Sequence, residues 1–208
     1  MIDTALVVLL AVAAFFLGAC PFSLWIGKVK LRKDIRDFGD GNPGATNVFK
    51  AGSKAWGIIA LMADMLKGMP FVLIAQYLLG YTQPVCYIIA VCAILGHAYS
   101  PFLHFHGGKA LAVFAGTLLA LGRWDIILSL AILFFIGFLF INNDAWTVMI
   151  GMAGTLVYLS LTGADTWEIA FMAVVTAVLL MKHFQGLKTS PGASGRLLSW
   201  IRSRGKTA

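Results

Sequence analysis

The chain has 208 residues, of which 60% are hydrophobic and only 12% are charged, and its mean hydropathy is +0.86. One soluble core cannot bury that much apolar surface, so the composition excludes a soluble globular domain and predicts a polytopic membrane protein. The formal net charge is +7, but the basic residues lie between apolar runs and near the C-terminus, where lipid headgroups would meet them. We therefore expect no nucleic-acid binding.

The apolar segments predict an all-α integral membrane fold, a bundle of seven transmembrane helices, because about 20 apolar residues cross the hydrocarbon core of a bilayer. The expected helices span residues 4–26, 55–79, 84–103, 110–121, 126–141, 145–161 and 167–181. The fourth is short, so we expect it either to begin earlier, near Gly107 and Gly108, or not to span. We expect one membrane domain over residues 1–188, followed at 189–208 by a flexible linker and a short basic amphipathic tail.

Positive charge is distributed unevenly between alternate loops. Of the sixteen Lys and Arg residues, fourteen fall in the first loop, the third loop and the C-terminal tail. Arg123 alone falls on the other side, and Lys67 lies within a helix. Because loops rich in Lys and Arg stay cytoplasmic, we predict that the N-terminus is outside and the C-terminus is in the cytoplasm. The polar loops that carry glycines and histidines then share the cytoplasmic face.

The stretch from Gly39 to Lys50 is unusually polar between two apolar runs, and it reads Gly-Asp-Gly-Asn-Pro-Gly-Ala-Thr-Asn-Val-Phe-Lys. Three glycines within six residues favour positive φ angles and can turn several N–H groups toward one point. Asn42, Thr46 and Asn47 add hydrogen-bond donors. This pattern indicates an anion cradle, with a tight turn that caps the next helix as the alternative.

Asp64 and Lys67 lie inside the second apolar segment, three residues apart and therefore on one helical face. An ionised side chain at the bilayer centre costs about 2.5 to 3.5 kcal/mol, so we predict that the two pair and face the bundle. The sequence leaves open whether this pair is purely structural or supports a functional site.

Gly107, Gly108 and Lys109 open the fourth apolar segment and form a second candidate anion cradle, because a helix N-terminus and one ammonium would converge there. His104 and His106 precede these residues, and His97 lies within the third segment. No Cys or carboxylate accompanies the histidines in this loop, so we expect hydrogen-bonding roles and no metal site.

Four motifs in matching order resemble the PlsY family of bacterial acyl-phosphate:glycerol-3-phosphate acyltransferases, over nearly the whole chain. The motifs are Asp34-Ile35-Arg36, Gly41-Asn42-Pro43-Gly44-Ala45-Thr46-Asn47, Asp64-x-x-Lys67-Gly68, and Leu95-Gly96-His97 leading to Gly107-Gly108-Lys109. The resemblance implies an enzyme that moves an acyl chain from acyl phosphate to the 1-hydroxyl of glycerol 3-phosphate, giving lysophosphatidic acid for phospholipid synthesis. It implies no cofactor, membrane lipid around the protein, and no obligate protein partner.

The same resemblance implies a bacterial plasma (inner) membrane location, an active site on the cytoplasmic face, and the roles of individual residues. The expected phosphate and substrate binders are Asn42, Gly44, Thr46, Asn47, Lys50, Gly107, Gly108 and Lys109. The expected catalytic residues are His97, His183 and Asp40, and Asp64 with Lys67 would be the supporting ion pair.

The chain departs from the family pattern at polar positions. Asp40 stands in place of a serine, Lys50 of an arginine and Ala110 of a glycine, and Phe184-Gln185-Gly186 replaces Arg-Glu-Asn. The loop from Asn142 to Asp144 also lacks the Arg-Tyr-x-Ser-like sequence of the family.

Asp40 is the departure with the clearest chemical meaning, because it brings a negative charge to an anion cradle. We expect it either to pair with Lys50 or Arg36, leaving the cradle neutral, or to receive a hydroxyl or ammonium of another acceptor. The alternatives to the family activity are thus a diverged member with a different acceptor or without turnover and, in another class, a small membrane transporter.

Overall fold

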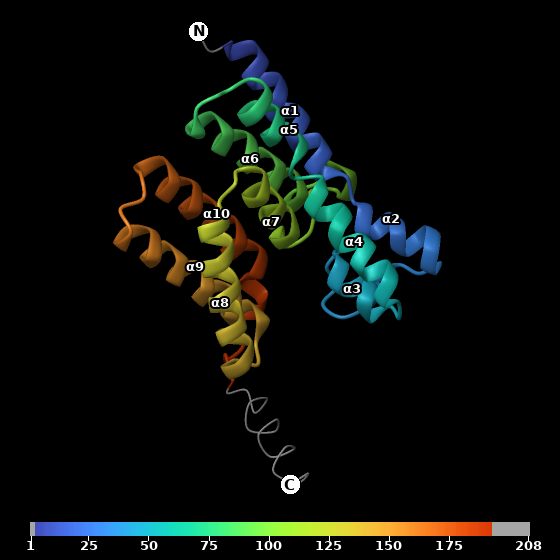
Figure 1. The fold of residues 1–208 in the computed structure, drawn as a ribbon. Coiled ribbons are helices and arrows are strands. Elements are labelled where there is room, and N and C mark those ends of the chain that lie inside the picture. The colour runs from blue at the N-terminus through green and yellow to red at the C-terminus, as the bar shows by residue number, and fades with distance from the viewer. Residues whose placement is uncertain (1–2, 193–208) are drawn as a thin grey trace.

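The computed structural model describes residues 3–192, and every secondary-structure element in this part of the chain is a helix (Figure 1). The α-helices are α1 (Thr4–Ala19), α2 (Phe22–Ile26), α3 (Ala45–Lys50), α4 (Lys54–Leu66), α5 (Pro70–Leu73), α6 (Gln83–Ala98), α7 (Leu111–Ala120), α8 (Trp124–Phe140), α9 (Asp144–Leu161) and α10 (Thr166–Leu187). The π-helical turns are η1 (Gly27–Leu31) and η3 (Ile74–Leu78), and the 3-10 turns are η2 (Ile35–Asp37) and η4 (Pro101–Leu103). The predicted amphipathic part of the tail lies outside the described residues.

The predicted apolar segments are helical in the expected order. Five helical segments are long and apolar enough to cross a membrane, namely Thr4–Leu31, Lys54–Leu78, Gln83–Leu103, Asp144–Leu161 and Thr166–Leu187. Two shorter apolar helices, α7 and α8, occupy the remaining predicted positions. The prediction of an all-helical membrane fold is therefore confirmed at this level.

Two of the predicted helices are divided where a proline interrupts the backbone hydrogen bonds. Pro21 separates α1 from α2, and Pro70 begins α5 after a turn that follows α4. Proline has no N–H to donate and its ring crowds the preceding turn, so each apolar segment bends at this point. The two breaks lie close together, because Lys67 at the end of α4 donates from Nζ to the Cys20 carbonyl oxygen at 2.7 Å.

The short helix α7 begins at Leu111, so the expectation that it starts inside the Gly107-Gly108 stretch is wrong. Ala110, the residue before it, has φ 63°, a left-handed conformation that cannot continue a right-handed helix. Most of α7 is buried, including Val113, Phe114 and Leu118, so protein rather than lipid surrounds this ten-residue helix.

The helices α1 and α6 pack closely along each other and form the spine of the bundle. A methyl group at Gly18 of α1 would collide with the Ala93 carbonyl of α6, and one at Gly96 of α6 would collide with the Phe15 carbonyl of α1. The glycines therefore let two helix backbones touch, as small residues do in membrane bundles.

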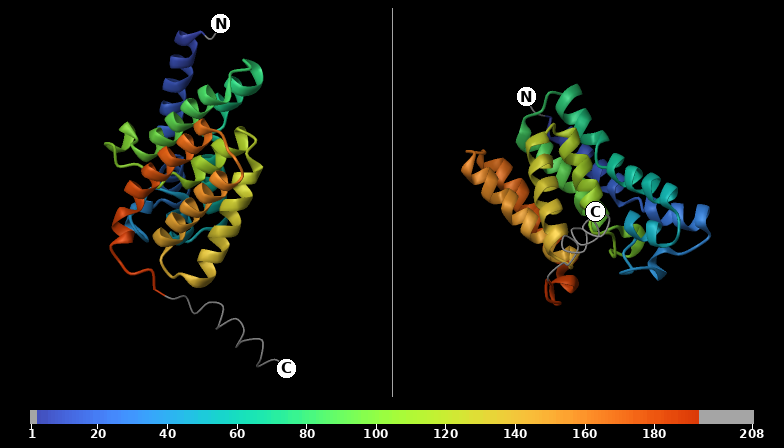
Figure 2. Two further views of the ribbon diagram at one scale, coloured as in Figure 1. Left: turned by 90° about the vertical axis from the view of Figure 1, so that its left-hand side faces the viewer. Right: turned by 60° about the horizontal axis from the view of Figure 1, so that its bottom comes forward.

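The remaining helices form two groups on either side of α6 and α7. On one side, α8 packs on α9 and α9 on α10, which in turn contacts α6 (Figure 1). In Figure 2 these helices, coloured yellow to red, lie next to one another in both views. On the other side, α4 packs on α7 and contacts both α2 and α3. A site between the two groups thus draws on segments far apart in the sequence.

Arg123, between α7 and α8, joins three helices at the end of α7 opposite Lys109. Its guanidinium donates from Nε and Nη2 to the two carboxylate oxygens of Asp125 at 3.0 and 2.7 Å, and it also pairs with Glu168. Its Nη1 lies 3.4 Å from the Tyr87 hydroxyl oxygen. This cluster links α6, α8 and α10. It gives a structural role to Arg123, the one basic residue predicted to lie on the opposite side of the bilayer from the other basic loops.

Candidate active site

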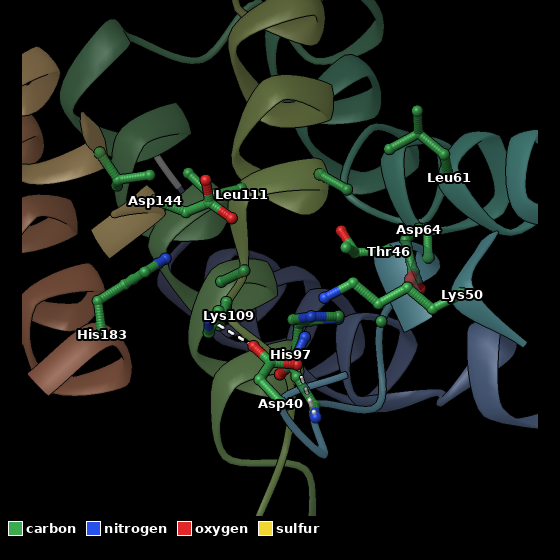
Figure 3. A pocket seen from close by; sticks show the side chains of 16 residues that line it. Asp40, Thr46, Lys50, Leu61, Asp64, His97, Lys109, Leu111, Asp144 and His183 are labelled. Atoms are coloured by element: carbon green, nitrogen blue, oxygen red, sulfur yellow. Dashed lines mark hydrogen bonds and ion pairs between the residues drawn. The ribbon is translucent and has the colours of Figure 1, made fainter. Parts of the chain in front are cut away.

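A cavity of about 290 Å³ lies between the loop before α3, the segment before α7, and helices α4, α9 and α10 (Figure 3). Nine of the predicted site residues line it: Asp40, Asn42, Gly44, Thr46, Lys50, Asp64, His97, Lys109 and His183. Asn42 and Lys109, which come from the two predicted cradles, face the same space. Leu61, Leu111 and Val148 add an apolar part to its wall.

Asp40 and Lys109 form an ion pair in this cavity, with 2.6 Å between Oδ2 of Asp40 and Nζ of Lys109 (Figure 3). The other carboxylate oxygen of Asp40 accepts hydrogen bonds from the backbone N–H of Asn42 at 3.2 Å and from Nδ2 of Asn47 at 3.1 Å. The two cradles are therefore joined by a contact between their charged side chains.

The expected partners of Asp40, Lys50 and Arg36, are both wrong. Arg36 pairs with Asp34 two residues away, at 2.6 Å between Nη2 and Oδ2. Lys50 faces the cavity, and among residues 3–192 no carboxylate lies within ion-pair distance of its ammonium. The loop before α3 folds so that Asp40 reaches the segment before α7. This contact could not be predicted from residues that are close to Asp40 in the sequence.

The surroundings of Asp40 keep its side chain ionised. Partial burial by itself raises the pKa of this carboxyl. The hydrogen bond and the charge of Lys109, together with the Asn42 N–H and the Asn47 amide, outweigh burial and lower the pKa to about 2. At neutral pH the pair is thus a carboxylate and an ammonium.

The loop before α3 is fixed by its own polar groups. Asn47 is buried, and its Nδ2 also donates to the Asn42 carbonyl oxygen at 2.8 Å. Two of the three predicted turn glycines, Gly39 and Gly41, have positive φ angles of 62° and 73°, whereas Gly44 is extended. Asn47 therefore holds the loop from behind and is not part of the cavity wall.

The Gly107-Gly108-Lys109 segment is fastened to the end of α6. The Gly108 N–H donates to the His97 carbonyl oxygen at 3.0 Å, so this N–H is not available to a ligand as the sequence suggested. A methyl group at Gly108 would overlap the His97 imidazole, which explains why a glycine is needed. What this segment presents to the cavity is the ammonium of Lys109.

Lys182 on α10 is a contributor that the sequence analysis missed. Its Nζ donates to the carbonyl oxygens of Ala98 at 2.8 Å and Gly107 at 2.9 Å. It thereby ties α10 to both sides of the turn between α6 and α7. Its position directly before His183 was the feature of the sequence that could have indicated this role for Lys182.

The two predicted histidines lie on the cavity wall. His97 is buried at the end of α6, against the Gly107-Gly108 segment. His183 is also buried, and its Nδ1 lies 2.8 Å from the Leu179 carbonyl oxygen, which leaves Nε2 for a ligand. Asp144, the first residue of α9, lines the same cavity and was not predicted as a site residue.

The predicted pairing of Asp64 with Lys67 is confirmed. Their charged atoms lie 2.7 Å apart and both side chains are almost fully buried. The Ser23 hydroxyl donates to Asp64, and Lys67 also bonds the Cys20 carbonyl. Asp64 contributes to the cavity wall, whereas Lys67 lies behind it at the two helix breaks.

Two departures from the family pattern have a local structural consequence. Ala110 adopts the left-handed conformation that a glycine tolerates without strain. Gly186 lies so close to Ala145 that any larger residue would push against α9. Asn143 closes this contact, because its Nδ2 donates to the Gly186 carbonyl oxygen and to Oγ1 of Thr189, both at 2.8 Å.

The fold and the cavity define a helical membrane protein with a polar site of lysines and histidines beside an apolar wall. The sequence matches the family model for glycerol-3-phosphate acyltransferase over residues 8–190. The chain belongs to this family, and the resemblance to PlsY is confirmed.

Curated relatives and solved structures match over most of the chain. A glycerol-3-phosphate acyltransferase of Dechloromonas aromatica is 34% identical over 85% of this chain and 88% of its own length. One of Enterococcus faecalis is 33% identical over 95% of each chain. The crystal structure of PlsY, an integral membrane glycerol 3-phosphate acyltransferase, in its glycerol 3-phosphate form has a TM-score of 0.79 at 27% identity, over 93% of this chain and 92% of that chain. The lysophosphatidic acid form has a TM-score of 0.78 at 26% identity, over 92% and 96%.

Proposed function

We propose that the protein transfers an acyl chain from acyl phosphate to the 1-hydroxyl of glycerol 3-phosphate, giving lysophosphatidic acid for phospholipid synthesis. Family membership supports this activity, and so do the substrate and product named for the two similar crystal structures. The observation that carries the proposal is the cavity in which Lys50, Lys109 and His183 meet beside an apolar wall. Both substrates carry phosphate, and one also carries a hydrocarbon chain.

In the proposed mechanism the side chains bind and orient, because an acyl phosphate is already activated. The acceptor hydroxyl oxygen attacks the acyl carbon, the bond from this carbon to the phosphate oxygen breaks, and phosphate leaves. Lys109 and Lys50 hold phosphate oxygens. Nε2 of His183 accepts the hydrogen bond of the attacking hydroxyl, takes up its proton as the ester forms, and passes this proton to the leaving phosphate. Holding two reactants in register lowers the barrier without a covalent intermediate.

The experiment that tests this activity is direct. Detergent-solubilised protein is supplied with palmitoyl phosphate and glycerol 3-phosphate, and lysophosphatidic acid is measured by mass spectrometry. We expect product to accumulate with time and enzyme concentration, and heat-denatured protein to give none. Folded protein that yields no lysophosphatidic acid would reject the proposal.

A different acceptor is the second candidate, and the observation that favours it is the carboxylate of Asp40 on the cavity wall. An acceptor that carries both an ammonium and a hydroxyl would satisfy this carboxylate. A panel of hydroxyl acceptors in the same assay separates the two candidates. Asp40→Ser together with Lys50→Arg restores two family residues and is expected to raise turnover of glycerol 3-phosphate. We leave Gly186 unchanged, because Ala145 leaves no room for a side chain there.

We further propose seven membrane spans in the bacterial inner membrane, with the N-terminus outside and the active site at the cytoplasmic face. The distribution of Lys and Arg supports this orientation. In a variant without Cys20, Cys86 and Cys92, a membrane-impermeant maleimide applied to spheroplasts should label Thr82→Cys but not Ser190→Cys. Both positions are exposed in the structure, so the reverse pattern would overturn the orientation.

A further inference from the structure

We propose that Asp40 is a built-in competitor for the substrate phosphate, so that phosphate binds by taking the place of its carboxylate on Lys109. This inference rests on the proposed function, since it explains how the substrate phosphate gains its site. It makes Asp40 a residue that determines ligand specificity.

The first argument is that the donors predicted for a bound anion are directed at Asp40. The Asn42 N–H, the Asn47 amide and the Lys109 ammonium all contact its carboxylate, at 3.2, 3.1 and 2.6 Å. A carboxylate that accepts an N–H, an amide and an ammonium resembles a small bound anion. The donors of the anion cradle are therefore in place, and the Asp40 carboxylate occupies the position of a bound anion.

The second argument is the position of the pair among the cavities. Besides the cavity of about 290 Å³, one of about 450 Å³ lies against residues 142–145 and 189–192, and one of about 770 Å³ lies against the end of α10 and the turn after α6. Asp40 and Lys109 line all three of these cavities, and no other residue within 3–192 does. The pair thus lies where the three cavities adjoin, so a ligand that replaces Asp40 on Lys109 can reach each of them.

The third argument is that the Asp40 carboxylate can be displaced without disturbing a packed core. Its side chain is 44% exposed, so it can turn toward water without crossing a packed core. Lys50 lines two of the three cavities and holds no carboxylate among the described residues, so it offers an entering phosphate a first contact. The phosphate then repels Asp40 and replaces it on Lys109.

Displacement of this kind selects ligands by charge. A monoanionic ligand exchanges one negative charge for another on Lys109 and gains little. A phosphate monoester near neutral pH carries a charge of about −1.5 to −2, so it gains more from the same exchange. Because the displaced Asp40 carboxylate also repels a dianion more than a monoanion, removal of its charge should favour glycerol 3-phosphate more than glycerate.

The experiment is a calorimetric titration of the full-length protein in detergent with glycerol 3-phosphate and, separately, with glycerate. Asp40→Asn removes the charge but keeps an oxygen that can accept from Asn42 and Asn47, and Asp40→Ser introduces the family residue. We expect either change to tighten glycerol 3-phosphate binding about tenfold, equal to about 1.4 kcal/mol, and to change glycerate binding less. The matched control is Asp37→Asn, because Asp37 is exposed on η2 and lines none of the three cavities. Its affinities should stay at the wild-type values.

The outcomes separate this inference from the proposed acyl transfer. Unchanged or weaker glycerol 3-phosphate binding in whichever Asp40 variant unfolds at the wild-type temperature would overturn the competitor role. Tighter binding without any lysophosphatidic acid from wild type or variant would reject the acyl transfer and leave the competitor role standing. In Asp40→Asn combined with Lys109→Met, the gain should disappear, because the contested ammonium is gone.

Discussion

Two lysine–aspartate pairs border the same cavity, and their geometry is nearly identical while their surroundings differ. The charged atoms are 2.7 Å apart in the Asp64–Lys67 pair and 2.6 Å apart in the Asp40–Lys109 pair. The side chains of the first pair are 2% and 1% exposed, and those of the second are 44% and 33% exposed. The distance between the charges therefore does not tell the two pairs apart.

The two pairs differ in the environment that each charged side chain would enter if its ion pair were broken. Asp64 and Lys67 are almost fully buried, with Ser23 and the Cys20 carbonyl as further partners, so breaking this pair would leave a charge with little contact with water. Asp40 and Lys109 border open cavities, and either can exchange its partner for a ligand or for solvent. Burial therefore keeps the Asp64–Lys67 pair together, whereas exposure allows Asp40 and Lys109 to exchange each other for a ligand or for water.

The largest effect is expected from Lys67→Met, which leaves the Asp64 carboxylate buried without a counter-charge. Breaking a buried pair in this way typically costs about 3 to 5 kcal/mol. The free energy of unfolding in mixed detergent micelles measures the loss, with Lys109→Met as the matched control at about 1 kcal/mol or less. Equal losses in the two variants would remove the distinction between the pairs.

Lys109→Met is expected to have its main effect on catalysis. Without the ammonium, the leaving phosphate loses a charge-assisted contact, and removal of one such group typically lowers turnover about 10²- to 10³-fold. Initial rates of lysophosphatidic acid formation provide the measurement, and Lys54→Met, outside the cavity lining, serves as the control. A Lys109→Met protein with full activity would show that this pair is not part of the site.

The effect of pH on the competition should be small over the physiological range. Because the pKa of Asp40 is lowered to about 2, the pair is complete above the ordinary carboxyl pKa of 3.8 and is lost only as the pH falls through about 2. Glycerate stays a monoanion over this range, so the ratio of its affinities in Asp40→Asn and wild type should stay constant between about pH 5 and pH 8. A ratio that falls toward one near pH 5 would mean that Asp40 is already taking up a proton there.

The smallest effect is expected from Lys50→Arg. The substitution keeps the positive charge and adds a planar fork that matches two phosphate oxygens, so the Michaelis constant for glycerol 3-phosphate should fall about two- to fivefold. Lys54→Arg at the start of α4 is the control and should change nothing. If both variants behave alike, Lys50 does not contact the phosphate.

Much of the fold could be predicted from the sequence, because the length and hydrophobicity of a segment are local properties. The apolar segments became helices in order, and the spacing of Asp64 and Lys67 was enough to predict their pairing. Where helix α7 begins was not predictable, because it depends on the left-handed conformation of Ala110, which an alanine in the sequence does not indicate.

The residues of the site were also largely predictable, but their partners were not. Polar residues in and between apolar segments are expected to meet inside a membrane bundle, and nine of the predicted site residues do line the main cavity. The partner of Asp40 depends on how two loops pack, and Lys109 is far more distant in sequence than Lys50 or Arg36. Lys182 was missed for the same reason, since its acceptors lie on other elements.

The carbonyl groups near the Pro21 break have a consequence for biosynthesis. The Cys20 carbonyl is capped by Lys67, and the neighbouring Ala19 carbonyl accepts from the Ser100 hydroxyl at 2.6 Å. Both donors emerge from the ribosome long after the first apolar segment does. The Cys20 carbonyl also accepts from the nearby Phe22 N–H at 3.0 Å, but the Ala19 carbonyl enters the translocon still needing water or a temporary donor. The final shape of this segment is set only when the third span has joined it, so maturation of the N-terminal helix must be post-insertional.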